Sequence, residues 1–179
     1  MELIQSIDRS VLDSIVDIFS CPLLDKIMPF ITAIGNGGIL YIILAIMLMI
    51  FKKTRKYGIM LGMALAFGFV FGNIILKNVV ARPRPFYIDC ELLIKAPDDY
   101  SFPSGHTMAS FEMASVMFYM NRKIGYVAIA IATLVAFSRL YLYVHFPTDV
   151  IFGCILGTFF GILSVKIYGY ICKKYSMTK

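Results

Sequence analysis

Long apolar runs alternate with short polar segments along most of this chain. Four strong runs cover residues 57–80, 107–120, 124–144 and 150–172, and charged or turn-forming residues bound each of them. A helix needs about 20 predominantly apolar residues to cross the hydrocarbon core of a bilayer. The pattern therefore predicts an all-α, polytopic membrane helix bundle, in which the second run continues a helix that opens at Ser104.

The first 51 residues are harder to divide into spans. Residues 1–21 place apolar side chains at helical spacing among acidic and polar ones, which predicts an amphipathic helix lying in the membrane interface. Residues 22–34 and 39–51 are largely apolar, but a glycine-rich break at 35–38 leaves each piece short of a straight span. We interpret them as two spans, which gives six transmembrane helices in total; one bent re-entrant unit is the alternative.

The composition indicates that lipid is the main solvent of this chain. Of its 179 residues, 59% are hydrophobic and only 16% are charged, and the mean hydropathy is +0.79. A soluble domain typically has about 25% charged residues. We expect a single domain over residues 1–179. No basic-aromatic patch typical of nucleic-acid binding is present in the sequence, so nucleic acid is not expected as a partner.

The basic residues indicate the orientation. They gather at 52–56, at 122–123 and in the C-terminal tail, and the alternation of spans puts these three segments on one side of the membrane. By the positive-inside rule that side is cytoplasmic. The loop 81–103 and the turn 145–148 then share the extracytoplasmic face of the cell membrane.

Ionisable side chains gather at the span ends on this outer face, where the cost of burying them calls for a functional reason. The candidates are Lys77, Arg84, His106, Arg139, His145 and Asp149, with Ser104 and Gly105 at the start of a helix. Singly, each has an ordinary explanation: Lys77 and Arg84 as interface anchors, Arg139 as an ion-pair partner of Glu112 or Asp149, and Ser104 as a helix N-cap.

Together these residues indicate a site for phosphoryl transfer. Three cations can neutralise phosphoryl oxygens, and the first turn of a helix donates backbone N–H groups to an anion. Two histidines suit covalent catalysis with proton transfer. If a helix starts near Pro147, Asp149 can reach back to one nitrogen of His145, fix its tautomer and leave the other nitrogen free to attack.

No metal or cofactor is expected at this site. The four cysteines, Cys21, Cys90, Cys154 and Cys172, lack metal-ligand spacing, so we expect neither a zinc site nor a disulfide framework.

Three blocks of this sequence resemble the signature motifs of the type 2 phosphatidic acid phosphatase family. The blocks are residues 77–85 with Lys77 and Arg84-Pro85, residues 103–106 with Pro103-Ser104-Gly105-His106, and residues 138–149 with Ser138-Arg139, His145 and Asp149. The resemblance implies a metal-independent phosphatase that acts on a membrane lipid phosphate. It also implies the following roles: phosphate binding by Lys77, Arg84, Ser104, Gly105 and Arg139, nucleophilic attack by His145, orientation of His145 by Asp149, and protonation of the leaving group by His106.

Several questions stay open at this point. The resemblance favours undecaprenyl diphosphate as substrate, with phosphatidylglycerol phosphate, phosphatidic acid or a lipid phosphotransferase reaction as alternatives. A membrane anion-binding or transport protein is the alternative from a different class, although it would not need the His145–Asp149 pair. Arg82-Pro83 duplicates Arg84-Pro85, and only the family spacing favours Arg84. The sequence suggests no role for Glu112.

Overall fold

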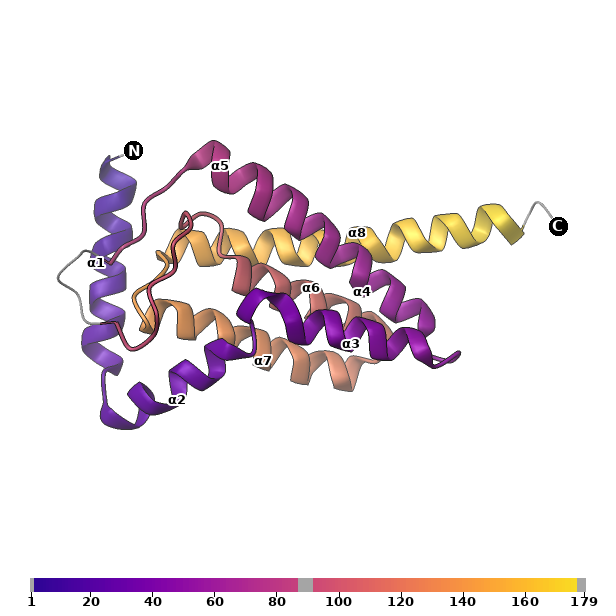
Figure 1. Cartoon of the computed structure of the whole chain (residues 1–179), viewed down its shortest axis with the longest axis horizontal. Helices are drawn as coiled ribbons and strands as arrows, with labels where there is room; N and C mark the ends of the chain where they lie inside the picture. Colours follow the sequence, from indigo (N-terminus) through magenta and orange to yellow (C-terminus); the bar gives the residue numbers. More distant parts are fainter. Residues whose placement is uncertain (1, 87–91, 177–179) are drawn as a thin grey trace.

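The computed structural model of the chain describes residues 2–86 and 92–176, and its regular structure there is helical (Figure 1). The all-α prediction is confirmed. The helices are α1 (Glu2–Phe19), α2 (Pro22–Ala33), α3 (Ile39–Ile50), α4 (Arg55–Phe67), α5 (Lys77–Val80), α6 (Gly105–Met120), α7 (Arg122–Tyr141) and α8 (Pro147–Ser176), with a 3₁₀ turn η1 (Asn36–Gly38) and a π-helical stretch η2 (Gly68–Leu76).

Residues 22–50 form one bent unit, so the prediction of two spans in this segment is wrong. Gly37 and Gly38 have φ values of 58° and 67°, a left-handed conformation that glycine adopts without the penalty of a Cβ atom. This turn bends the chain between α2 and α3 without reversing it (Figure 1).

Within the described residues, four helical units are therefore long and apolar enough to cross a membrane: Pro22–Ile50, Arg55–Val80, Arg122–Tyr141 and Pro147–Lys174. The helix α6 has 16 residues and is shorter than these four. The total of six transmembrane helices predicted from the sequence is not reached among the described residues, because residues 22–50 form one unit and α6 is not among the units long enough to span.

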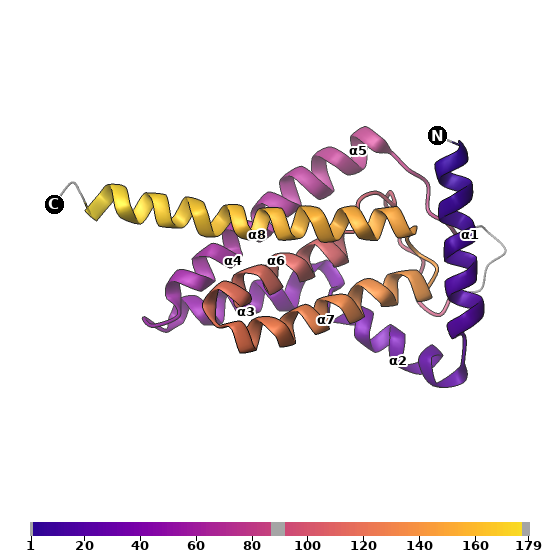
Figure 2. The same cartoon turned by 180° about the vertical axis from the view of Figure 1, so that it is seen from behind.

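The helix α1 runs across one end of the bundle, as both views show (Figures 1 and 2). Its apolar side chains at Leu3, Ile4, Ile7 and Val11 are exposed, whereas Leu12 is buried. Residues Glu2–Phe19 form the helix predicted within residues 1–21, with apolar and polar side chains at helical spacing. Its position in the membrane interface stays a prediction.

The helix α6 packs between α7 and α8 (Figure 2). Glycines on α8 make the close approach possible: a Cβ atom added at Gly157 would lie 2.3 Å from the backbone oxygen of Met108. Small residues at four-residue spacing let membrane helices pack backbone to backbone, and Gly153 and Gly161 extend this stripe. The packing brings the start of α6 to the start of α8, where the Ser104 N–H donates to the backbone oxygen of Asp149 at 3.1 Å.

The helices α4 and α5 are joined through η2 into one continuous unit. A π-helix holds more residues per turn than an α-helix, so it changes the direction in which later side chains point. In this protein the altered stretch ends directly before Lys77. The buried glycines Gly68 and Gly72 let η2 pack against the side chains of Glu112 and Met108 on α6.

Candidate active site

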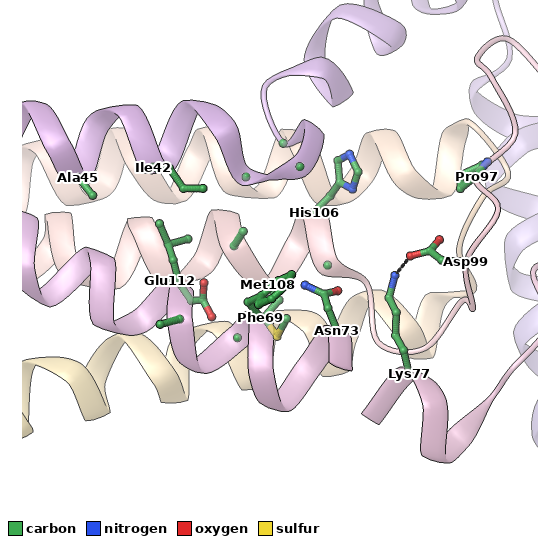
Figure 3. A pocket seen from close by; sticks show the side chains of 18 of the residues that line it. Ile42, Ala45, Phe69, Asn73, Lys77, Pro97, Asp99, His106, Met108 and Glu112 are labelled. Atoms are coloured by element: carbon green, nitrogen blue, oxygen red, sulfur yellow. Dashed lines mark hydrogen bonds and ion pairs between the residues drawn. The ribbon is translucent and has the colours of Figure 1, made fainter. Parts of the chain in front are cut away.

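Six of the eight predicted site residues line a single cavity of about 820 Å³: Lys77, Arg84, Gly105, His106, Arg139 and His145. Figure 3 shows Lys77 and His106 on opposite sides of this cavity, with Glu112 further along it. Asp149 is fully buried beside His145. Ser104 is also buried, with its Oγ atom 2.9 Å from Oγ1 of Thr107. The other two predicted residues therefore support the cavity wall instead of lining it.

Two of the three predicted cations bind the same carboxylate. Lys77 forms an ion pair with Asp99 (Figure 3). Arg84 forms an ion pair with the same carboxylate, and its Nε also donates to the backbone oxygen of Asp99 at 2.8 Å. Burial raises the pKa of Asp99, but the hydrogen bonds and charges of Lys77 and Arg84 outweigh burial and lower it to about 2. Asp99 therefore stays ionised near neutral pH and occupies cations that could hold phosphoryl oxygens.

The third cation, Arg139, is 1% exposed and belongs to α7. One of its terminal nitrogens donates to Oγ1 of Thr32 at 2.6 Å, while its Nε atom has no hydrogen-bond partner among the described residues. Of the salt bridges that those residues form, none links Arg139 to Glu112 or Asp149. A buried guanidinium N–H beside a cavity is available to a bound anion.

His145 presents its two ring nitrogens to different surroundings. Nδ1 lies 3.6 Å from Oδ2 of Asp149 and 3.5 Å from Oγ of Ser101, whose hydroxyl donates to the same carboxylate oxygen. Nε2 lies 3.2 Å from a terminal nitrogen of Arg84 and therefore faces the cations. The sequence analysis did not identify Ser101. The only feature of the sequence that could have identified Ser101 is its position next to the second motif block.

The environment of His145 favours the neutral ring. Burial lowers the pKa of His145 well below its usual value, and the positive charges of Arg84, Arg139 and Lys77 lower it further. A neutral imidazole whose Nδ1–H faces Asp149 and Ser101 keeps a lone pair on Nε2. That lone pair is the feature needed for attack on a phosphorus atom.

His106 is oriented by the bent unit, which the sequence suggested only as a helix break. Its Nε2 atom lies 2.9 Å from Oδ1 of Asn36 in η1. Gly35 leaves the room that the ring fills, because a Cβ atom there would lie 2.8 Å from Cδ2 of His106. The same turn that bends residues 22–50 therefore places the second histidine on the cavity wall.

The duplicated Arg-Pro pairs point in different directions. Arg84 lines the cavity, whereas Arg82 binds Oδ1 of Asp149 at 2.7 Å and Oδ2 of Asp8 at 2.6 Å. Tertiary structure thus separates two residues that the sequence pattern alone left equivalent.

Two remaining expectations concern metals and Glu112. Among the residues that the structure describes, no three His, Cys, Asp or Glu side chains form a group that could hold a metal ion. Cys90 lies outside the described residues, and the other three cysteines are free thiols.

Glu112 faces the bundle interior, as expected for an acid inside a helix bundle, and its Oε1 atom is buried without a partner among the described residues.

Comparison with known proteins identifies the family of this chain. Residues 56–172 match the PAP2 superfamily. The chain is 37% identical over 147 residues to an undecaprenyl-diphosphatase of Sulfolobus acidocaldarius, covering 80% of this chain and 70% of that protein. It is 34% identical over 141 residues to an undecaprenyl-diphosphatase of Bacillus subtilis, covering 78% of this chain and 72% of that protein.

A solved structure has the same architecture. The crystal structure of a transmembrane PAP2 type phosphatidylglycerolphosphate phosphatase from Bacillus subtilis superposes with a TM-score of 0.81 at 26% identity, over 96% of this chain and 89% of that one. The resemblance seen in the three motif blocks is confirmed, and the alternative of an anion carrier is set aside. The chain belongs to the PAP2 superfamily and is a multi-pass membrane enzyme that hydrolyses lipid phosphates.

Proposed function

We propose that this enzyme hydrolyses a long isoprenoid lipid diphosphate, of the undecaprenyl diphosphate type, to the lipid monophosphate and inorganic phosphate. The observation that carries this proposal is the cavity, which joins the cations to an apolar stretch between α3 and the α4–η2 unit. Ile42, Ile46 and Phe69 line this stretch and are at the same time exposed on the outside of the bundle. A lipid tail can therefore remain in the membrane while its headgroup reaches the histidines.

In the first step, Nε2 of His145 attacks the terminal phosphorus atom. The N–P bond forms as the P–O bond to the lipid monophosphate breaks, and His106 donates a proton to the departing oxygen. Lys77, Arg84 and Arg139 stabilise the charge on the equatorial oxygens. The phosphoryl group must first displace the carboxylate of Asp99 from Lys77 and Arg84.

In the second step, water attacks the phosphorus atom of the phosphohistidine. His106 accepts a proton from this water, the N–P bond breaks and inorganic phosphate leaves. Asp149 and Ser101 keep the Nδ1 side of His145 in place throughout, so that Nε2 faces the phosphoryl group in both steps. No step requires a metal ion.

Phosphatidylglycerol phosphate is the second candidate substrate. It is favoured by the structural similarity to the phosphatidylglycerolphosphate phosphatase described above. The amino-acid identity to the two undecaprenyl-diphosphatases is higher, which favours the isoprenoid diphosphate over phosphatidylglycerol phosphate.

Initial rates of phosphate release from a lipid panel test the proposal. The purified protein is given undecaprenyl diphosphate, undecaprenyl phosphate, phosphatidylglycerol phosphate and phosphatidic acid under identical micellar conditions. We expect the highest kcat/KM for undecaprenyl diphosphate. A higher value for phosphatidylglycerol phosphate would favour the second candidate, and transfer of labelled phosphate to another lipid would identify a phosphotransferase.

Activity is expected to persist in EDTA and to be blocked by vanadate. The described residues bring three cations and two histidines to one cavity, and vanadate adopts the five-coordinate geometry through which phosphoryl transfer passes. Inhibition constants for vanadate and phosphate, measured with and without EDTA, check this expectation. If EDTA abolishes activity and magnesium restores it, the metal-free mechanism is wrong.

The active site is expected to face the outside of the cytoplasmic membrane. The basic segments at 52–56 and 122–123 lie at the bundle end opposite to α1 and α5 (Figure 1), and basic loops stay in the cytoplasm. In a cysteine-free background, a single cysteine at Asp98 or at the exposed Asp17 of α1 should react with an impermeant thiol reagent in intact cells. A cysteine at Arg55 should react only after lysis. The reverse labelling pattern would overturn the orientation.

A further inference from the structure

The helix α1 is tied to His145 and Asp149 by a bridge of charged side chains. The guanidinium of Arg82 donates to Oδ1 of Asp149 at 2.7 Å through one terminal nitrogen and to Oδ2 of Asp8 at 2.6 Å through the other. Its first nitrogen also donates to Oγ1 of Thr148 at 2.7 Å. Arg82 therefore connects a carboxylate of α1 with the carboxylate next to His145.

Asp8 also binds the first turn of α8 directly. Its Oδ1 atom accepts the backbone N–H of Thr148 at 3.0 Å, and its Oδ2 atom accepts the Thr148 hydroxyl. Backbone N–H groups in the first helical turn lack partners within the helix, and a carboxylate there is favoured by the helix dipole. Because Thr148 precedes Asp149, this contact fixes the segment that carries the orienting carboxylate.

Burial makes the bridge energetically demanding. The side chains of Asp8 and Asp149 are 3% and 0% exposed, and that of Arg82 is 14% exposed and stacks on the ring of Phe146 at 4.0 Å. Arg82 is the cation in ion-pair contact with both carboxylates among the described residues. Removing it would leave two buried negative charges close together, and they would be expected to move apart or take up water.

We propose that Asp8 and Arg82 are positioning residues for phosphoryl transfer, which hold Asp149 so that His145 is aligned for attack. The inference rests on the proposed role of His145 as nucleophile. It gives α1 a part in the reaction, because the helix supplies one end of the bridge. Neither residue lines the cavity, so the bridge acts on the transfer step and leaves phosphate binding to Lys77, Arg84 and Arg139.

The two Arg-Pro pairs provide a matched test. Arg82→Gln and Arg84→Gln make the same chemical change two residues apart. For Arg82→Gln, kcat should fall by about 10- to 100-fold, the size expected when a reacting group is misplaced by roughly 1 Å, while KM and the vanadate inhibition constant change little. Arg84→Gln should raise both KM and the vanadate inhibition constant. If Arg82→Gln behaves like Arg84→Gln, Arg82 is a phosphate ligand and the inference is wrong.

A second pair separates positioning from simple anchoring of α1. Asp8→Asn removes the bridge, whereas Asp13→Asn removes another α1 carboxylate, one that accepts a hydrogen bond from the Tyr143 hydroxyl and does not touch Asp149. Asp8→Asn should slow phosphoenzyme formation in rapid-quench measurements, and Asp13→Asn should not. Equal slowing by both variants, or none by Asp8→Asn, would overturn the inference. If Arg82→Gln fails to fold, the comparison of Asp8→Asn with Asp13→Asn still tests whether the bridge acts on phosphoryl transfer.

The wild-type protein shows which proposal has failed. If it forms no phosphohistidine, the proposed role of His145 is wrong, whatever the variants do. If it forms phosphohistidine at a normal rate and Arg82→Gln and Asp8→Asn do so equally fast, only the bridge is wrong.

Discussion

Replacing His145 with alanine is expected to abolish lipid phosphate hydrolysis and to prevent formation of a covalent phosphoenzyme. The loss should be roughly 10⁶-fold, the size seen when a hydrolase loses its nucleophile. The physical reason is the geometry of the ring, whose Nε2 atom faces the cations while Nδ1 faces Asp149 and Ser101. His106 lines the same cavity, but its Nε2 atom lies 2.9 Å from Oδ1 of Asn36.

The covalent intermediate gives this prediction its measurement. After brief incubation with a substrate carrying labelled phosphate, an acid-labile and base-stable label should map to His145 by peptide sequencing. An unchanged thermal unfolding midpoint shows that His145→Ala is folded. Label on His106, or an acid-stable label on a serine, would show that the roles are assigned wrongly.

Replacing His106 with alanine is expected to slow hydrolysis by roughly 10²–10⁴-fold, the usual contribution of a general acid or base. In the proposed mechanism His106 protonates the departing lipid oxygen, so the loss should depend on the leaving group. With an activated aryl phosphate, whose leaving group departs without a proton, His106→Ala should form the phosphoenzyme almost as fast as wild type. Hydrolysis of that phosphoenzyme should still be slow, because the second step needs a base.

The control for His106 is its partner on the bent unit. Asn36→Ala removes the acceptor for Nε2 of His106 and should reproduce the same leaving-group dependence with a smaller loss. If His106→Ala slows phosphoenzyme formation equally with lipid and aryl substrates, the role of leaving-group acid is contradicted. Equal slowing would indicate that His106 contributes to phosphate binding instead.

The convergence of the motif blocks could be predicted from the sequence because spans alternate in direction. Lys77 ends one apolar run, the block at 103–106 begins the next helix, and the turn at 145–148 joins the last two runs. Helix ends that follow one another in this way must meet at one face of the membrane. Six of the eight predicted residues accordingly share one cavity.

The residues missed by the sequence analysis share a different property. Asp8, Asn36, Asp99 and Ser101 lie in the amphipathic helix, the glycine turn and the polar loop, all of them outside the three motif blocks. The contact between Asp8 and Thr148 joins residues 140 positions apart, and that between His106 and Asn36 joins residues 70 apart. Such pairs depend on how a loop or a surface helix folds back over the bundle, and hydrophobic spacing carries no information about that path.

The sequence by itself determined that the chain is an all-α membrane bundle with three charged blocks at one end, because transfer into lipid requires long apolar runs and penalises unpaired charge. Tertiary structure decided that residues 22–50 bend without turning back, because the left-handed glycines at 37 and 38 set that angle. It also decided that Arg84 faces the cavity while Arg82 faces Asp8 and Asp149. Two identical side chains acquire different roles there, because only the folded loop brings each one to its own partners.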